Sequence, residues 1–196
     1  MNRTRTIVIA FSTLDGVIED PDGRDGTPNG GWAFRHGPEA VAGDKFRLGS
    51  LFDSGVLLMG RKTWQQFSRL WPSRTDDFSA AMNRIPKLVV SRTVCDLSAW
   101  QNSSQITGDL EEAVAKRRSE QDVIIVGSAS VVHALAGQDL IDEYRILVFP
   151  ELAGRGTKLF PAPMVPARLR LRSADIVGPA VLMCYERTAP GRTAVW

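Results

Sequence analysis

A glycine, two cations and a hydroxyl follow one another directly in the segment Gly60-Arg61-Lys62-Thr63. The segment comes after an apolar run at residues 56–59, which is typical of a buried strand. A glycine at the carboxyl end of such a strand lets the backbone approach a ligand, and the first turn of a following helix offers free N–H groups to an anion. We therefore expect a phosphate group to bind here. The alternative is that Gly60 only forms a turn and that both cations are solvated.

Two other apolar runs end in residues that suit the same ligand. Ser91 and Arg92 follow the run at residues 88–90. The run at residues 123–126 is followed by small residues that open a helix, namely Gly127, Ser128, Ala129 and Ser130, and then by Val131. Ligands of open α/β sheets bind outside the carboxyl ends of the strands, so three such ends predict one extended phosphorylated ligand.

The chain lacks the common competing motifs. It contains no G-x-x-x-x-G-K-[ST] segment, no G-x-G-x-x-G segment that opens a helix after a strand, and no G-x-S-x-G segment. Their absence argues against a standard nucleoside triphosphatase, a Rossmann dehydrogenase and a hydrolase.

Apolar runs and helix-like stretches alternate along the chain. Continuous β-branched runs predict strands buried on both faces, at residues 7–11, 56–59, 88–90 and 123–126. Helices are expected at residues 38–52, 61–69, 109–119 and 130–136. The last third changes to strands without intervening helices, at residues 144–149, 168–175 and 181–186. We therefore predict an α/β domain with a mixed, mostly parallel sheet and antiparallel strands at its C-terminal end.

Residues 19–37 form a long connection that is rich in glycine, proline and aspartate. A connection of this length is either a lid or a disordered insertion. The length of 196 residues fits a single domain, which we assign to residues 1–188, with a frayed tail at residues 189–196.

Composition and charge exclude several classes of protein. The chain carries 24 Lys and Arg against 22 Asp and Glu, and the basic residues are scattered, whereas nucleic-acid binders cluster them. With only two histidines and two cysteines, we expect no metal site and no disulfide framework. The apolar run near the N-terminus is too short for a signal peptide or a membrane span. We therefore expect a cytoplasmic protein that binds neither nucleic acid nor membrane.

Several segments resemble the dihydrofolate reductase superfamily. Leu58-Met59-Gly60-Arg61-Lys62-Thr63-Trp64 is similar to the M-G-R-x-T-W motif of that family, and Leu14-Asp15-Gly16-Val17-Ile18 is similar to the start of its mobile active-site loop. The second half is closer to the riboflavin-pathway reductases, the C-terminal domain of the bifunctional deaminase-reductase and its stand-alone relatives. That match rests on Val126-Gly127-Ser128, Leu140-Ile141-Asp142-Glu143, Leu159-Phe160 and residues 150–156. The resemblance covers nearly the whole chain and implies a three-layer fold with helices on both faces of the sheet.

The resemblance implies an NADPH-dependent reductase. It places the cofactor phosphates at Gly60, Arg61, Lys62 and Thr63, and the adenosine ribose phosphate at Ser91 and Arg92. It places the pyrophosphate and the nicotinamide side at Gly127, Ser128, Ala129, Ser130 and Val131. Ala10 and Phe11 would pass near the nicotinamide through backbone groups, and Ile18 would pack on it. The 2′-phosphate distinguishes NADPH from NADH, and arginine recognises it with paired hydrogen bonds.

The substrate side departs from true dihydrofolate reductases, because Val148 stands where those enzymes carry the threonine that partners their catalytic carboxylate. Those enzymes carry one carboxylate on the first helix, and counting back from Gly60 without gaps places Asp44 there. Asp44 is therefore the expected catalytic proton donor, with an ordinary surface residue and proton delivery by water as the alternative. The expected substrate-binding residues are Trp32, Phe67, Trp71 and Arg74. Aromatic residues at such spacing also occur in protein cores, and a solvated Arg74 is the alternative for the arginine.

These inferences predict a reductase that transfers a hydride from NADPH to a C=N or C=O bond of a small pterin-like or pyrimidine-like heterocycle. Two alternatives are a true dihydrofolate reductase and a non-catalytic NADP-binding sensor that has lost its proton donor. Riboflavin-type relatives are commonly dimers, whereas folate reductases of this size are often monomers. A homodimer and a monomer are therefore both open, with a homodimer as the expectation from the riboflavin-type resemblance.

Overall fold

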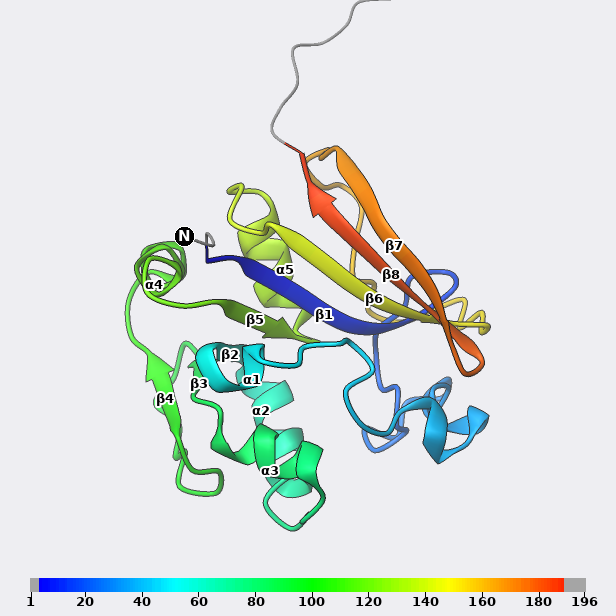
Figure 1. Cartoon of the computed structure of the whole chain (residues 1–196), viewed down its shortest axis with the longest axis horizontal. Helices are drawn as coiled ribbons and strands as arrows, with labels where there is room; N and C mark the ends of the chain where they lie inside the picture. Colours follow the sequence, from blue (N-terminus) through cyan, green and yellow to red (C-terminus); the bar gives the residue numbers. More distant parts are fainter. Residues whose placement is uncertain (1–3, 189–196) are drawn as a thin grey trace, which may run out of the picture.

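The computed structural model describes residues 4–188, which build one eight-stranded sheet with helices on both faces (Figure 1). The strand order across the sheet is β4-β3-β2-β5-β1-β6-β8-β7. The strands are β1 (Thr6–Thr13), β2 (Val56–Gly60), β3 (Lys87–Val90), β4 (Ser103–Ile106), β5 (Val123–Val126), β6 (Glu143–Phe149), β7 (Leu169–Val177) and β8 (Ala180–Arg187). The first six strands of the order are parallel, whereas β8 pairs antiparallel with β6 and with β7. The predicted mixed sheet is confirmed, and the tail predicted at residues 189–196 lies outside the described residues.

The central strands are apolar on both faces because helices cover both faces. Ile7 and Val8 of β1 point to opposite sides of the sheet, and both are completely buried. On one side, α4 (Leu110–Arg118) and α5 (Ala129–Ala136) add Val114, Val132 and Leu135 to an apolar cluster. On the other side, α1 (Leu51–Ser54), α2 (Arg61–Leu70) and α3 (Asp77–Arg84) add Phe52, Trp64 and Met82 to a second cluster. Among residues 4–188, no helix is long and apolar enough to cross a membrane.

The helix predicted at residues 38–52 is wrong. The chain forms two short 3-10 turns, η1 (Phe34–His36) and η2 (Pro38–Ala40), and then the single turn of α1. Gly43, Arg47 and Gly49 have φ angles of 74°, 54° and 51°, which a right-handed helix excludes. The segment is therefore a series of turns that lies against the sheet.

Two elements lack the patterns that would predict them. β4 is an edge strand of sequence Ser-Ser-Gln-Ile, so it shows no apolar run. α3 begins after Asp76, whose side chain accepts a hydrogen bond from the N–H of Ser79. β4 is hard to predict because it lies at the edge of the sheet, where burial is incomplete. α3 is short, and Ser79 and Met82 are its buried residues.

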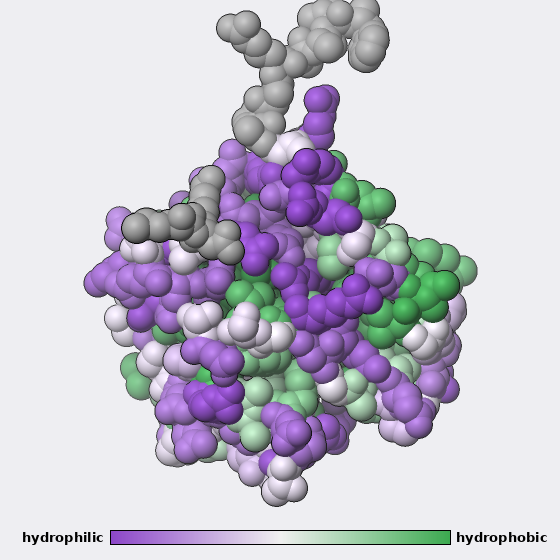
Figure 2. Space-filling model, in the orientation of Figure 1, coloured by the Kyte–Doolittle hydropathy of each residue, from purple (hydrophilic) through white to green (hydrophobic). Residues whose placement is uncertain are grey.

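The other edge of the sheet exposes apolar side chains. The alternation of residues 168–175 predicts a half-exposed strand, but large side chains of β7 and β8 are exposed, with Leu171 at 53% and Ile176 at 85%. Leu169 and Val181 add to this surface at 37% and 38%. Figure 2 shows hydrophobic residues gathered on the side of the molecule where β7 and β8 lie.

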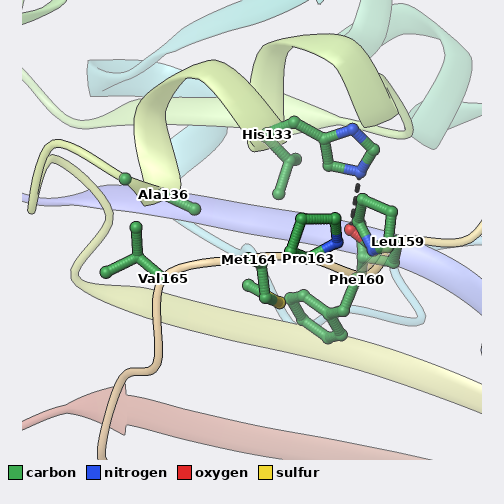
Figure 3. Close-up of a pocket in the computed structure, with 10 residues that line it drawn as sticks. His133, Ala136, Leu159, Phe160, Pro163, Met164 and Val165 are labelled. Atoms are coloured by element: carbon green, nitrogen blue, oxygen red, sulfur yellow. Dashed lines mark hydrogen bonds between the residues drawn. The ribbon is translucent and has the colours of Figure 1, made fainter.

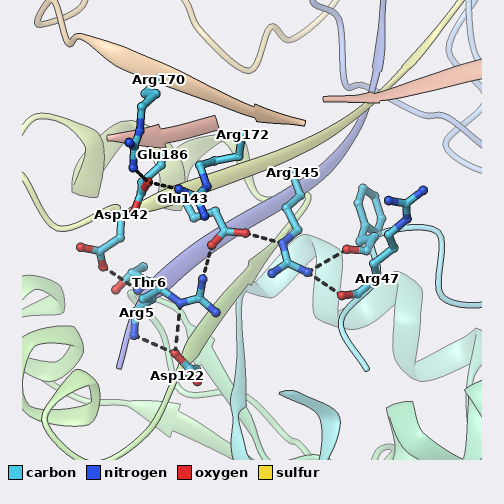
Figure 4. A network of polar contacts seen from close by, with 11 residues as sticks. Arg5, Thr6, Arg47, Asp122, Asp142, Glu143, Arg145, Arg170, Arg172 and Glu186 are labelled. Atoms are coloured by element: carbon cyan, nitrogen blue, oxygen red, sulfur yellow. Dashed lines mark hydrogen bonds and ion pairs between the residues drawn. The ribbon is translucent and has the colours of Figure 1, made fainter. Parts of the chain in front are cut away.

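A network of charges ties the amino ends of the central strands together (Figure 4). Glu143 at the start of β6 is 9% exposed and pairs with Arg5 and Arg145, each at 2.5 Å. The Arg145 guanidinium also donates to the carbonyl oxygens of Phe46 and Arg47, at 2.9 and 2.6 Å. Arg145 therefore fixes the series of turns to the sheet through charge-assisted hydrogen bonds.

Replacing Arg145 by alanine is expected to destabilise the fold by about 3 kcal/mol, because the buried Glu143 carboxylate loses one of its two cationic partners. Two loop carbonyl groups lose their donor at the same time. Arg172→Ala is the matched control, since the Arg172 side chain is 58% exposed and pairs with Glu186 at the surface. The control is expected to cost less than about 0.5 kcal/mol. Chemical denaturation measures both, and equal stabilities of the two variants would contradict the role of Arg145.

Candidate functional site

The carboxyl ends of β2 and β5 lie side by side, but the helices that follow them leave toward opposite faces. β2 pairs in parallel with β5. α2 begins directly after β2 and packs on one face, whereas α5 begins after β5 and packs on the other. Such a divergence opens a crevice at the edge of the sheet, where α/β proteins bind ligands. The predicted phosphate segments at residues 60–63 and 127–131 therefore meet at one place.

α2 and α5 lack the side-chain caps that α3 and α4 possess. Gly60 precedes α2 and Ser128 precedes α5, and neither makes a side-chain hydrogen bond to the first turn. Asp76 and Asp109, in contrast, cap α3 and α4 with their carboxylates. The first turns of α2 and α5 contain no acidic residue. Two helix N-termini therefore present free N–H groups and positive dipole ends at the same edge, which suits an anion.

One hydroxyl links the two helix starts. Ser128 Oγ accepts a hydrogen bond from the N–H of Gly60 at 2.9 Å and lies 2.9 Å from Thr63 Oγ1. A Cβ built on Gly60 would lie 3.7 Å from Ser128 Oγ and 3.8 Å from Ser130 Oγ, in the gap between the helices. Gly127 has a φ angle of 52°, which favours glycine. Gly60 and Gly127 add no side chain at this junction, where hydroxyl groups and two helix N-termini meet.

Arg61 faces the segment that follows β3. Its guanidinium donates to Thr93 Oγ1 at 3.0 Å, and Ser91 Oγ donates to the carbonyl oxygen of Thr93 at 2.8 Å. Arg92 is exposed in the same segment. Within residues 4–188, neither Arg61 nor Arg92 pairs with a carboxylate. Two cations without acidic partners therefore lie near the crevice, as a phosphate ligand requires.

The loop at residues 19–37 is ordered around one buried carboxylate. Asp20 is 4% exposed, and its oxygens accept from the N–H groups of Asp25 and Thr27 and from the Thr27 hydroxyl. The indole N–H of Trp32 donates to the carbonyl oxygen of Glu19 at 2.9 Å and closes the loop. The structure therefore shows an ordered loop and no disordered insertion, whereas its function as a lid stays a prediction.

Asp25 attaches this loop to the first two turns of α2. Its carboxylate pairs with Lys62 Nζ at 2.9 Å and accepts from Gln66 Nε2 at 2.6 Å. The contact with Asp25 raises the pKa of Lys62, and the charges of Glu19 and Asp20 add to this effect. Lys62, which was predicted to bind phosphate beside Arg61, is therefore already neutralised by an acidic loop.

The side chains predicted near a nicotinamide are largely packed in the protein. Ala10, Ile18 and Val131 lie in the apolar cluster next to α5, with exposures of 3%, 7% and 1%. Phe11 stacks on Phe46 with 5.3 Å between ring centroids, and Ala129 is half-buried at the start of α5. Contacts of Ala10 and Phe11 with a ligand would therefore use the backbone.

The structure corrects the placement of the four predicted substrate-binding residues. Trp32 is 1% exposed and packs against Phe149 in a third apolar cluster. Phe67 and Trp71 contact each other in the aromatic cluster under α2, and Arg74 lies 5.3 Å from the Trp71 ring centroid. Trp71 is ten residues beyond Arg61, so it lies about 15 Å from the crevice along the helix axis. Phe67, Trp71 and Arg74 are therefore not brought to the crevice. Trp32 lies in the core beside the end of β6.

Asp44, the predicted proton donor, does not lie on a helix. One of its carboxylate oxygens accepts from the N–H of Leu48 at 2.9 Å and the other from the N–H of Gly49 at 2.8 Å. Both oxygens therefore close the turn before α1. Asp44 therefore has a structural role in this turn, which differs both from a proton donor and from the ordinary surface residue of the alternative.

A pair of titratable groups at the end of β6 was missed. His36 Nε2 lies 3.0 Å from Glu151 Oε1, and an Arg35 nitrogen lies 3.4 Å from Glu151 Oε2. The carbonyl oxygen of Glu151 accepts from the N–H of Leu14 at 2.9 Å, which joins the turns after β1 and β6. His36 and Glu151 are 115 positions apart, so no local pattern could have predicted their contact.

A separate cavity of about 200 Å³ lies between α5 and residues 159–165 (Figure 3). Apolar side chains line it, including Leu159, Phe160 and Met164, and its one titratable group is His133. His133 Nε2 lies 2.9 Å from the carbonyl oxygen of Leu159. In the described part of the chain, no three His, Cys, Asp or Glu residues are grouped so as to hold a metal ion. The crevice between β2 and β5 is thus the better site for a charged ligand.

Comparison with known proteins gives one family. The model described as RibD C-terminal domain matches residues 5–183. The chain is similar in structure to a protein of Shewanella sp. PV-4 described as a candidate riboflavin biosynthesis protein, with a TM-score of 0.74, 20% identity, and coverage of 95% of this chain and 100% of the other. A pyrimidine reductase-like protein of Corynebacterium diphtheriae gives a TM-score of 0.64 at 12% identity, with coverage of 96% and 93%.

A third similar structure is longer than this chain. It is a diaminohydroxyphosphoribosylaminopyrimidine deaminase/5-amino-6-(5-phosphoribosylamino)uracil reductase of Thermotoga maritima, with a TM-score of 0.57 and 15% identity. The match covers 95% of this chain and 57% of the Thermotoga protein. At these identities the structures show a shared fold. A search of curated proteins gives no match.

Asp25→Asn is expected to strengthen the binding of inorganic pyrophosphate at the crevice, because it releases Lys62 from its carboxylate. An exposed ion pair contributes up to about 1 kcal/mol, so the expected gain is up to about fivefold in Kd. Asp22→Asn is the matched control, since Asp22 lies in the same loop but pairs with Arg24. Titration calorimetry measures the affinity of both variants. An unchanged or weaker affinity of Asp25→Asn would contradict the idea that Asp25 competes with the anion for Lys62.

Proposed function

Because this chain belongs to the RibD C-terminal domain family, we propose that it is an NADPH-dependent reductase acting on a small pyrimidine-like heterocycle. The observation that carries the proposal is the meeting of two uncapped helix N-termini at Gly60 and Ser128, with Arg61 and Arg92 nearby. Family membership supports a reductase role in the riboflavin pathway. The use of NADPH and the class of substrate are the parts that we propose.

The order of the strands supports a dinucleotide cofactor. The predicted contacts fall on Ser91 and Arg92 after β3, on residues 60–63 after β2, on residues 127–131 after β5, and on the end of β1. These strands are neighbours in the order β3-β2-β5-β1. Neighbouring strands are about 4.8 Å apart, so the four ends span about 14 Å. An extended ligand along this edge would meet the groups in the same order as the parts of NADPH.

The residues of this chain bind and orient the two reactants. When bound, NADPH supplies the hydride. The N–H groups at the starts of α2 and α5 would hold the pyrophosphate, and Arg61 would select the 2′-phosphate. The loop organised by Asp20 contacts α2 through Asp25 and the end of β6 through Trp32, so it limits the access of water to the strand ends.

A pyrimidine substrate is favoured over a pterin. The similar Thermotoga protein is described as a reductase of 5-amino-6-(5-phosphoribosylamino)uracil, and the Corynebacterium protein as pyrimidine reductase-like. A true dihydrofolate reductase is disfavoured because Asp44 closes a turn with both carboxylate oxygens. We therefore propose hydride transfer to a C=N or C=O bond of a pyrimidine that carries a ribose phosphate. A cytoplasmic location stays a prediction.

A non-catalytic NADP-binding sensor is the alternative function. The loss of NADPH absorbance distinguishes these functions. The purified protein is mixed with NADPH and 5-amino-6-(5-phosphoribosylamino)uracil, and separately with NADPH and dihydrofolate. Turnover of the uracil supports the proposal, and turnover of dihydrofolate alone supports a folate enzyme. Tight NADPH binding without turnover favours the sensor, whereas no NADPH binding overturns both.

Arg61→Ala is expected to weaken NADPH binding about 10- to 100-fold, the range for the loss of hydrogen bonds to a charged group. NADH lacks the 2′-phosphate, so its binding should change by no more than about twofold. Arg69→Ala is the matched control, because Arg69 lies in the last turn of the same helix. Fluorescence titration gives the dissociation constants, and equal weakening of both dinucleotides would mean that Arg61 does not recognise the 2′-phosphate.

We also propose that the chain forms a homodimer through the apolar surface of β7 and β8. Ile176 and Val181 are a cross-strand pair on this surface, and both are exposed. Met164 and Val165, on the segment over α5, are exposed at 44% and 58%. An apolar surface of this kind on a folded protein marks an interaction site.

Ile176→Glu is expected to convert the dimer to a monomer, because it places a charge in the contact. Val94→Glu is the control, since Val94 is 95% exposed after β3, far along the sheet order from β7. Light scattering coupled to gel filtration gives the masses. A monomeric unmodified protein, or a dimer that persists in Ile176→Glu, would rule out this interface.

A further inference from the structure

The carboxyl end of β6 is the next position along the sheet edge after the end of β1, since β1 and β6 pair in parallel. In the proposed function, the nicotinamide lies at the end of β1. The substrate must lie against the nicotinamide, because hydride transfer requires contact. The substrate therefore occupies the space at the ends of β1 and β6, a placement that rests on the proposed function.

His36 and Glu151 meet at this end of the sheet. Their side chains are 21% and 22% exposed, and His36 Nε2 lies 3.0 Å from Glu151 Oε1. The His36 ring lies 5.7 Å from the ring of Phe149, the last residue of β6, and Phe149 lies 5.5 Å from the ring of Phe11 on β1. The carbonyl oxygen of Glu151 accepts from the N–H of Leu14, just after β1. The pair is thus attached to both strand ends.

We propose that His36 donates the proton that completes the reduction and that Glu151 is its positioning residue. A carboxylate bound to one ring nitrogen fixes the orientation of an imidazole and stabilises its protonated form. The other nitrogen is then available to a substrate. Among the described residues, His36 makes its side-chain hydrogen bond through Nε2, so Nδ1 is the nitrogen assigned to proton transfer.

The step balances in atoms and electrons. The electrophilic carbon of the C=N or C=O bond takes a hydride, with its electron pair, from a reduced nicotinamide, which is thereby oxidised. The π electrons of the double bond move to the nitrogen or oxygen, and this atom takes the proton from His36 Nδ1. His36 is left neutral and regains a proton from solvent, to which its side chain is partly exposed.

Charges of both signs surround His36. Glu151 Oε1 lies 3.0 Å from His36 Nε2, and Arg35 lies 3.4 Å from the second oxygen of Glu151. Glu39 on η2 adds a second carboxylate on the following turn. β6 contributes only the uncharged ring of Phe149 to this contact.

Two other residues compete for the same role. The Asp44 carboxylate is committed to the N–H groups of Leu48 and Gly49. His133 lies on α5 beside the apolar cavity, where it contacts the carbonyl oxygen of Leu159 (Figure 3). His36 is therefore the histidine that the fold places at the ends of β1 and β6.

Kinetics with NADPH and 5-amino-6-(5-phosphoribosylamino)uracil test the assignment. His36→Gln should lower kcat about 100-fold, the low end for general acid catalysis, with KM changed by no more than about twofold. It should also remove the alkaline limb of the kcat–pH profile. Glu151→Gln should lower kcat less and move that limb to lower pH. His133→Gln is the matched control and should leave both kcat and the profile unchanged.

Nuclear magnetic resonance gives a readout that does not depend on turnover. The chain has two histidines, so a protein labelled with ¹⁵N-histidine gives two sets of ring signals, and His133→Gln assigns them. In Glu151→Gln, the ring ¹⁵N signals of His36 should shift, because Nε2 loses its carboxylate partner, while those of His133 stay. Unchanged His36 ring signals would overturn the role of Glu151, whatever the activity.

NADPH binding to the unmodified protein distinguishes a failure of the proposed function from a failure of the proton-donor role of His36. Without NADPH binding, the proposed function fails. With NADPH binding but no turnover, the sensor alternative holds and the proton-donor role is overturned. With turnover, the role of His36 is overturned if His36→Gln keeps the rate and the alkaline limb, or if Asp44→Asn removes that limb in its place.

Discussion

The opposite departure of α2 and α5 from two neighbouring parallel strands is the constraint on which the site depends. β2 connects through α2 and α3 to β3 on one side, whereas β5 connects through α5 to β6 beyond β1 on the other. Connections between parallel strands are right-handed, so a change in direction along the sheet forces a change of face. The strand order alone therefore creates the crevice. Gly60 and Ser128, which have no capping role, then leave two sets of N–H groups without an internal partner.

The two ends of the sheet satisfy their charges differently. At the amino ends, Glu143 lies between Arg5 and Arg145, and the carbonyl groups of the neighbouring turns use the remaining donors. At the carboxyl ends of β2 and β5, neither α2 nor α5 has a capping side chain, although such a cap would stabilise each helix by about 1 kcal/mol. Among the described residues Arg61 pairs with no carboxylate, whereas Asp25 pairs with Lys62. The net charge of +2 hides this asymmetry, because acidic and basic residues nearly balance over the whole chain. The ion pairs at the amino ends stabilise the fold, whereas the uncapped helix starts at the carboxyl ends remain available to an anion.

Those features that depend on local pattern could be predicted from the sequence. Strands buried on both faces appear as β-branched runs, and the glycine and hydroxyl residues that end them mark the crevice. Features that depend on contacts between distant segments could not be predicted. His36 reaches Glu151, and Trp32 is buried, only because the loop folds back onto the end of β6. The prediction of a helix at residues 38–52 was wrong for another reason. The backbone of Gly43, Arg47 and Gly49 is left-handed, and the Asp44 carboxylate closes a turn there.

The composition of the loop at residues 19–37 has a structural reason that differs from flexibility. Asp20 needs several backbone N–H groups to converge on its buried carboxylate, and a chain turns this tightly only with glycines. Gly23, Gly26 and Gly31 accordingly have φ angles of 77°, 68° and 77°. The same residues that indicate disorder therefore build a compact unit around one charge. If this loop acts as a lid, it must move as a whole, because motion within it would strip the Asp20 carboxylate of its partners.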